Sequence, residues 1–332
     1  MSAVRDDLCV LTQAMRRHLG AGVTVENIVI PTLGGVNRTI IFDCVDGTAR
    51  RRMVSRQSTY EGEGNPFVRP QTQFKIMEKA FQNGFPVPEP IVSFEPDDGL
   101  GEGFVSAFVQ GETMPKRIVS GPEFDRVRPK LARQSGELLA QLHSIDFTEV
   151  RELSQLPDSV DPLAAQRSRY DTYNEAHPAI EIGLRWLELH RLNKGDRVLL
   201  HGDFRTGNLM LSQMGIEAVL DWECCHIGDP AEDLGWLCTR SWRFDRPDRI
   251  VGGFGELEDL LAGYADYGGR RITIEEVHYW QVFGLVRWSI LNAMQAHGHV
   301  FGGRRDVTFA ACGRNASLVE YDLLMTLRGL FR

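Results

Sequence analysis

Apolar positions in the first third of the chain repeat at two spacings, one typical of helices and one typical of strands. Helical spacing of Leu8, Leu11, Met15 and Leu19 predicts an amphipathic helix over residues 6–19. A second helix is predicted over residues 70–83, where an apolar stripe ends before Gly84. Short runs rich in apolar and β-branched residues predict strands, which fall at residues 25–30, 40–42, 53–56, 91–94 and 104–109. This part of the chain is therefore predicted to mix a small sheet with helices.

From residue 111 onward the pattern is chiefly helical. One long helix is predicted from Val127 to His143, and others at residues 162–177, 180–192, 257–267, 274–297 and 307–327. The exception lies between residues 198 and 221. A short buried strand at residues 198–200 runs into Gly202, and two further apolar runs flank a turn at Met214 and Gly215, which predicts a hairpin.

Polar side chains gather around this hairpin. Asp203 follows a buried strand, Asn208 precedes one arm of the hairpin and Asp221 follows the other arm, so Asn208 and Asp221 can face each other. Phosphoryl transfer needs a carboxylate that orients the attacking hydroxyl and accepts its proton, and hard oxygen ligands for magnesium. The pattern therefore suggests Asp203 as the base, Asn208 and Asp221 as metal ligands, and Glu223 as a further ligand. Each residue taken alone is more typical of a capped turn, and only the ordered set favours catalysis.

Three segments of the chain resemble the aminoglycoside phosphotransferase and choline kinase group: HGDFRTGN at 201–208, LDWE at 220–223, and GDP at 228–230 with Asp233 and Leu234. The resemblance implies a bilobal, protein-kinase-like α+β fold. Residues 1–110 would be a small nucleotide-binding N-lobe with an antiparallel sheet and a helix. Residues 111–332 would be a larger, mainly helical C-lobe that carries the catalytic hairpin and binds substrate. In this group Asp229 and Asp233 are largely structural.

Two stretches of the predicted N-lobe are candidates for nucleotide binding. Gly34 and Gly35 lie between two predicted strands, and glycine lets backbone N–H groups approach phosphates, although such a pair more often marks only a turn. In the resembling enzymes a turn of this kind, here followed by Asn37, lies above the triphosphate. Their inter-lobe hinge takes the adenine edge, and Phe108 and Val109 occupy that place here.

The phosphate-binding cation departs from the family pattern. Kinases carry lysine on the strand after the glycine turn, whereas here Arg56 is the candidate, since a guanidinium contacts phosphate in bidentate fashion. The family helix supplies a glutamate to the lysine, and the aligned residue here is Gln73. A glutamine can hydrogen-bond Arg56 but anchors it less firmly than a carboxylate. An alternative function is therefore a nucleotide-binding, kinase-like regulatory module that is catalytically weak or inactive.

Composition narrows the range of partners. The chain has 332 residues, of which 42% are hydrophobic, and a formal net charge of −8. The size suffices for two lobes, and the negative charge argues against a nucleic-acid partner. No stretch is long and apolar enough for a bilayer, and the N-terminus lacks the apolar core of a signal peptide. We therefore expect a cytoplasmic protein without a membrane partner.

The sequence predicts a small-molecule kinase that uses Mg²⁺ and ATP, or GTP, to phosphorylate a substrate hydroxyl. It leaves the acceptor and the oligomeric state open. Residues that could line an acceptor pocket are Trp236, Arg240, Trp242, Arg243, Trp280, Arg287, Trp288 and His297. The cluster at residues 240–244 suggests an anionic group on the acceptor. A third hypothesis is a metal-dependent hydrolase built on His201, Asp203, Asp221 and Glu223, which is disfavoured because such sites usually use more histidines.

Overall fold

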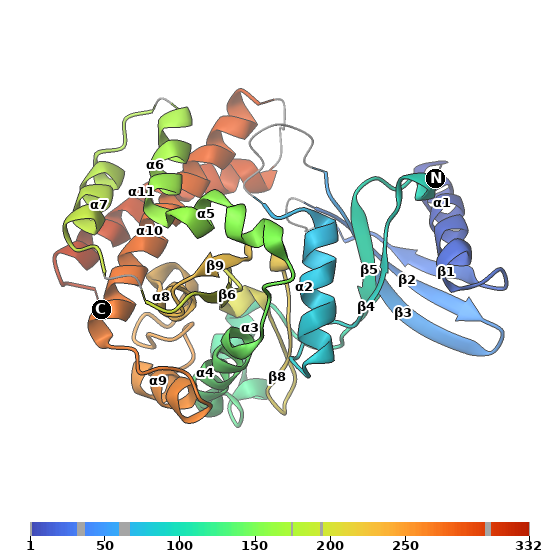
Figure 1. Cartoon of the computed structure of the whole chain (residues 1–332), viewed down its shortest axis with the longest axis horizontal. Helices are drawn as coiled ribbons and strands as arrows, with labels where there is room; N and C mark the ends of the chain where they lie inside the picture. The colour runs from blue at the N-terminus through green and yellow to red at the C-terminus, as the bar shows by residue number, and fades with distance from the viewer. Residues whose placement is uncertain are drawn as a thin grey trace. The chain divides into compact units, whose positions relative to one another are not determined.

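The computed structural model of the chain describes residues 2–31, 37–59, 67–173, 175–192, 195–302 and 307–331. Contacts divide the chain into two units (Figure 1). Unit 1 comprises Met1–Gln110 and Ala218–Cys224, and unit 2 comprises Gly111–Glu217 and Cys225–Arg332. The predicted phosphate-binding turn at Gly34 and Gly35 lies outside the described residues.

Unit 1 contains a five-stranded antiparallel sheet in the order β1-β2-β3-β5-β4. Its strands are β1 (Thr24–Val29), β2 (Arg38–Asp46), β3 (Ala49–Gln57), β4 (Pro90–Ser93) and β5 (Gly103–Ala107). Successive side chains of a strand point to opposite faces. Met53, Ser55 and Gln57 are therefore buried on one face of β3, and Arg56 lies on the other, less buried face. Arg56 pairs with Thr39 of β2 and Phe104 of β5.

Two helices cover the sheet of unit 1. Helix α1 (Ser2–Leu19) packs against β1, and α2 (Pro70–Gln82) packs against β4 and β5 (Figure 1). Leu11 and Met15 of α1 are fully buried with Ile40 and Phe42 of β2 in one apolar core. The apolar stripe predicted at the N-terminus therefore forms a helix whose apolar side packs into this core.

Unit 2 is mainly helical. Its helices are α3 (Pro115–Ser120), α4 (Arg128–Ser144), α5 (Pro157–Val160), α6 (Pro162–Thr172), α7 (Pro178–Leu189), α8 (Ala231–Cys238), α9 (Leu257–Asp266), α10 (Ile274–Val300) and α11 (Val307–Leu327). The long helix α10 packs against α7, α8 and α11, and α4 packs against α9. Helix α10 begins with a capping box, in which Thr273 accepts the Glu276 N–H and Glu276 accepts the Thr273 N–H. No helix in the described part of the chain is both long and apolar enough to cross a membrane.

Two short strand pairs carry the polar motif. Strand β6 (Val198–Leu200) pairs antiparallel with β9 (His226–Gly228), and β7 (Leu209–Leu211) forms the predicted hairpin with β8 (Ile216–Val219). Single turns of 3-10 helix complete the structure at Pro96–Asp98, Pro122–Phe124, Arg151–Gln155, Thr206–Asn208, Trp222–Cys224 and Arg240–Trp242. The motif of residues 201–208 thus begins where buried β6 ends.

Candidate active site

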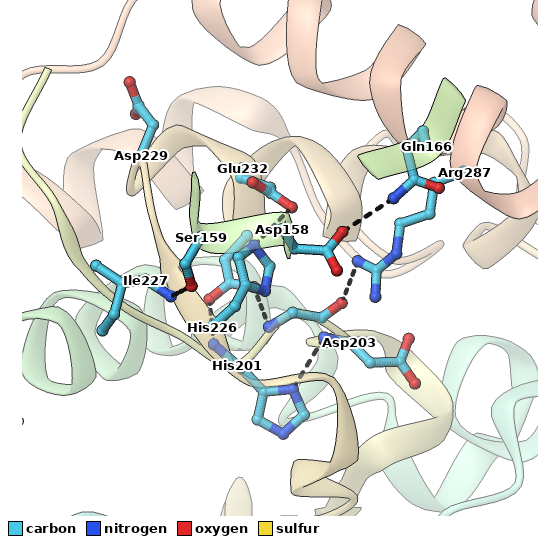
Figure 2. Close-up of polar contacts among 12 residues, drawn as sticks. Asp158, Ser159, Gln166, His201, Asp203, His226, Ile227, Asp229, Glu232 and Arg287 are labelled. Atoms are coloured by element: carbon cyan, nitrogen blue, oxygen red, sulfur yellow. Dashed lines mark hydrogen bonds and ion pairs between the residues drawn. The ribbon is translucent and has the colours of Figure 1, made fainter. Parts of the chain in front are cut away.

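The loop after β6 is built to hold Asp203 in one place. His201 is fully buried, and Gly202 has a φ of 73°, a left-handed conformation that glycine adopts without steric cost. The ring Nδ1 of His201 accepts the backbone N–H of Asp203 at 3.2 Å (Figure 2). His201 is therefore engaged with the loop itself, which does not support the metal-ligand role that the hydrolase hypothesis gives it.

Asp233 at the start of α8 fixes the backbone of this loop. Its carboxylate accepts the N–H of His201 at 2.8 Å and the N–H of Gly202 at 2.9 Å. His143 of α4 lies 3.2 Å from the same carboxylate and contacts the Tyr264 hydroxyl with its other ring nitrogen. Burial alone would raise the pKa of Asp233, but the hydrogen bond and charge of His143 hold this pKa below its usual value. Asp233 thus braces the loop, as the family resemblance implies.

Three N–H donors converge on the Asp203 carboxylate. The Asn208 amide donates to Oδ2 at 2.6 Å, and Arg205 Nε lies 3.0 Å from Oδ1 and 3.2 Å from Oδ2. The third donor is Trp236 Nε1 of α8, which is 2.9 Å from Oδ1. The structure therefore brings Asp203 and Asn208 together, as the motif predicted. Arg205 and Trp236 are partners of Asp203 that the sequence did not reveal.

The Asn208 side chain is oriented by Asp203. Its amide nitrogen donates to both the carboxylate and the backbone carbonyl of Asp203. The amide oxygen is consequently the atom left for another partner, and amide and carboxylate oxygens suit Mg²⁺. Among the described residues no group of three or more His, Cys, Asp and Glu side chains is arranged to hold a metal ion.

Unit 1 contains a second cluster, around Arg56. The Arg56 guanidinium lies 3.0 Å from Asp221 and 3.6 Å from Glu223, and the Asn37 amide donates to Glu223 at 2.7 Å. Burial alone would lower the pKa of Arg56, but the two carboxylates raise it. Asp221 has a φ of 71°, which is uncommon for a residue with a side chain and is best tolerated by Asn and Asp. Strained backbone of this kind is frequent at functional sites.

Gln73 does not take up the hydrogen bond to Arg56 that its aligned position would allow. Gln73 is buried in α2, and its amide donates to the Val68 carbonyl at 2.7 Å. The anionic partners of Arg56 are instead Asp221 and Glu223, two residues that the sequence suggested as metal ligands. No local pattern links Arg56 to these carboxylates, because they meet only when the chain returns to unit 1 after the hairpin.

Phe108 and Val109, the residues predicted to contact adenine, differ in their backbone hydrogen bonds. Phe108 donates its N–H to the Arg52 carbonyl at 3.0 Å, and its ring lies 5.0 Å from the Arg52 guanidinium carbon. The next residue, Val109, makes no backbone hydrogen bond within the described part of the chain. An N–H and a C=O that are free on one residue match the donor and acceptor that an adenine edge requires.

The structure does not support anion binding by Arg240 and Arg243. Arg243 is buried and donates to the Cys238 carbonyl at 2.9 Å, and Arg240 pairs with Asp322 at 3.3 Å. Both guanidinium groups therefore have partners within the protein.

Of the other suggested acceptor residues, Trp280 and His297 pack against neighbouring aromatic rings. Three further aromatic candidates form a row. The Trp242 ring centre lies 5.1 Å from that of Trp236 and 5.2 Å from that of Trp288, and Trp236 hydrogen-bonds Asp203.

The fold and the loop of Asp203 define a class, the kinase-like phosphotransferases. The family model for the phosphotransferase enzyme family matches residues 44–271, and the chain belongs to this family. Acyl-CoA dehydrogenase family member 11 from Gallus gallus is 31% identical over 264 residues, which cover 69% of this chain and 33% of that protein. Family member 10 from Mus musculus is 28% identical over 51% of this chain and 16% of that protein. The chain thus spans a third or less of these relatives.

Solved structures show the same fold at low identity. A Ralstonia eutropha protein described as a candidate aminoglycoside phosphotransferase has a TM-score of 0.68 at 19% identity, covering 96% of this chain and 98% of its own. An aminoglycoside phosphotransferase mutant solved with ADP and hygromycin B has a TM-score of 0.64 at 15% identity, covering 92% of this chain and 94% of its own. The predicted α+β, protein-kinase-like fold and the resemblance to this family are both confirmed.

Proposed function

We propose that this protein is a small-molecule kinase that transfers the γ-phosphoryl group of ATP, or GTP, to a substrate hydroxyl. The observation that carries the proposal is the Asp203 carboxylate, which is held by Asn208, Arg205 and Trp236 on a loop braced by Asp233. A carboxylate fixed in this way can orient an acceptor hydroxyl and take its proton. Membership of the phosphotransferase enzyme family supports the same reaction class.

The remaining residues take roles in nucleotide and metal binding. Asn208 and Asp221 would bind Mg²⁺, which would neutralise charge on the phosphates when bound. Arg56 would bind the phosphates, and the contacts of Glu223 favour a role as the anchor of Arg56, beside its expected role as a metal ligand. Phe108 and Val109 would take the adenine edge. Gly34, Gly35 and Asn37 would cover the triphosphate.

The acceptor would be a hydroxyl-bearing small molecule, in keeping with the net charge of −8, which disfavours nucleic acid. A structural neighbour was solved with the antibiotic hygromycin B, but that ligand belongs to the neighbour. We place the reaction in the cytoplasm, where nucleoside triphosphates are available.

A weakly active nucleotide-binding module is the second candidate. One observation favours it: Arg56 contacts Asp221, the proposed metal ligand, and receives no support from Gln73. Such a module would bind nucleotide without consuming it.

Thermal unfolding with ATP, GTP and ADP, each with and without magnesium, tests nucleotide binding. A ligand that binds only the folded state adds about 2.7 kcal/mol of stability at a concentration 100 times its Kd. We expect a magnesium-dependent rise in Tm that Asp221→Ala removes. The absence of a shift with every nucleotide would contradict the proposal.

Turnover separates the kinase from the idle module. ADP release from Mg·ATP would be followed across a panel of hydroxylated acceptors, and Asp203→Asn should slow it by at least about 100-fold, because an amide cannot accept the proton. Asp245→Asn is the matched control, since that carboxylate is exposed and pairs only loosely with Lys116. Equal rates for wild type and Asp203→Asn would overturn the assignment of Asp203.

A further inference from the structure

The donors to Asp203 differ in where they come from. Asn208 and Arg205 belong to the same loop as Asp203, and the Arg205 guanidinium carbon lies 4.8 Å from the Trp242 ring centre. Trp236 belongs to α8, and its indole N–H reaches Oδ1 at 2.9 Å. Among the three donors, Trp236 is the one that ties the carboxylate directly to a packed helix.

The indole of Trp236 is itself held from several sides. It is almost completely buried, and the Arg287 guanidinium carbon lies 5.0 Å from its ring centre. The Trp242 ring centre is 5.1 Å away on another side. Gly284 of α10 leaves room for it, because a Cβ at that position would lie only 3.0 Å from the indole. The ring cannot turn without displacing these neighbours.

Arg287 links the indole to the backbone of the catalytic loop. One guanidinium nitrogen donates to the Gly202 carbonyl at 2.6 Å, and the same guanidinium lies against the ring of Trp236. Arg287 thus contacts the residue before Asp203 and the residue that donates to its carboxylate. Through Arg287, α10 therefore contacts both the backbone next to Asp203 and the indole that binds its side chain.

We propose that Trp236 is a positioning residue that sets the rotation of the Asp203 carboxylate, and this inference rests on the proposed kinase function. With Oδ1 held by Trp236 and Oδ2 held by Asn208, the carboxylate keeps a lone pair directed at the acceptor hydroxyl. As the acceptor oxygen bonds to the γ-phosphorus, its proton passes to Asp203. The bond from the γ-phosphorus to the bridging oxygen breaks, and ADP leaves with the electron pair.

Trp236→Phe tests the inference because it keeps an aromatic ring and removes the N–H. The assay is ADP release from Mg·ATP with the best hydroxylated acceptor, or with water as the acceptor. We expect kcat to fall roughly 10- to 100-fold, as small misplacements of a catalytic group do, while KM for Mg·ATP stays within about twofold. Trp186→Phe is the matched control, since Trp186 packs on His190 and His278 of unit 2 and makes no contact with Asp203.

The outcomes separate the two proposals. Unchanged kcat in Trp236→Phe beside an active wild type would overturn the positioning role and leave the kinase standing. A rise in KM that matches the fall in kcat/KM would also overturn it, because that pattern indicates lost binding. An inactive wild type would overturn the kinase proposal and this inference together.

A spectroscopic measurement does not depend on the Trp236 variant folding well. The chain has six tryptophans, so selective ¹⁵N labelling gives six indole signals. In Asp203→Leu, which removes the acceptor, we expect one indole N–H signal to move upfield through loss of its charge-assisted hydrogen bond. Spectra in which all six signals stay in place would show that the indole does not report on Asp203, and would overturn the inference.

Discussion

At the scale of residues, the Arg56 cluster shows how two carboxylates accommodate a departure from a family pattern. An arginine on β3 needs an anionic partner, and α2 offers Gln73, which is already bonded to Val68. Asp221 at 3.0 Å and Glu223 at 3.6 Å supply carboxylates instead, and Asn37 orients Glu223 with a 2.7 Å hydrogen bond. A planar guanidinium can keep this contact and still present further N–H groups, which a lysine ammonium does less well.

Removing the guanidinium should weaken nucleotide binding. Hydrogen bonds to charged groups contribute about 1.5–3 kcal/mol, so Arg56→Gln is expected to raise the Kd for ADP roughly 10- to 100-fold. Calorimetric titration without magnesium isolates this phosphate contact. Arg50→Gln, on the same strand but half-exposed and paired with Asp43 and Glu26, should leave the Kd unchanged. Equal Kd values for wild type and Arg56→Gln would show that Arg56 does not contact the phosphates.

At the scale of elements, the loop that carries Asp203 depends on contacts with β6, α4 and α8. Strand β6 ends at Leu200, and Asp233 of α8 accepts the next two backbone N–H groups. His143 of α4 completes the contacts of this carboxylate. Because the carboxylate is fully buried, each of its partners replaces a lost water.

Asp233→Asn should be strongly destabilising. The new amide would turn an N–H towards a backbone N–H of the loop, and the negative charge facing His143 would be lost. We therefore expect the free energy of unfolding to fall by roughly 3 kcal/mol. Urea denaturation measures this change. Asp266→Asn, which removes an exposed carboxylate paired with Arg133, should shift stability by less than about 1 kcal/mol. Similar midpoints for the two variants would contradict the bracing role of Asp233.

At the largest scale, unit 2 buries a group of charged side chains near the loop that carries Asp203. His226 of β9 lies 3.2 Å from Glu232 of α8, with Asp158 of α5 and Arg287 of α10 in its surroundings (Figure 2). Burial alone would lower the pKa of His226, but the Glu232 carboxylate raises this pKa to about 9. His226 is therefore a cation in the folded protein at neutral pH.

This pairing predicts a loss of stability at alkaline pH. The pKa of His226 rises from 6.5 to about 9 on folding, so its contribution is complete below about pH 6.5 and is lost as the pH rises through 9. The full contribution is on the order of 3 kcal/mol, since one pKa unit corresponds to about 1.4 kcal/mol. Urea unfolding between pH 6 and pH 9.5 measures it. His226→Gln should flatten the decline, and a decline of equal size in that variant would assign the effect to other groups.

Much of the architecture is determined by the sequence alone. Periodic apolar residues predict α1, α2, α4 and α9 to α11. Apolar side chains at helical spacing lie on one face of a helix, and that face is buried whichever element it packs against. The loop from His201 to Asn208 is also local, since a strand, a left-handed glycine and a turn place Asp203 and Asn208 together within eight consecutive positions. These features need no information from distant parts of the chain.

Other features are decided only by the tertiary structure. The sequence suggested that Gln73 could contact Arg56 and that the Arg240 cluster could bind an anion. The fold instead pairs Arg56 with Asp221 and Glu223, and it engages Arg240 and Arg243 within the protein. It also places the Trp236 indole on Asp203, although aromatic residues at helical spacing are usually core. Hydrogen bonds between distant segments depend on the direction of each side chain once helices and strands have packed. Spacing along the chain determines which face of an element is buried, but not which partner that face meets.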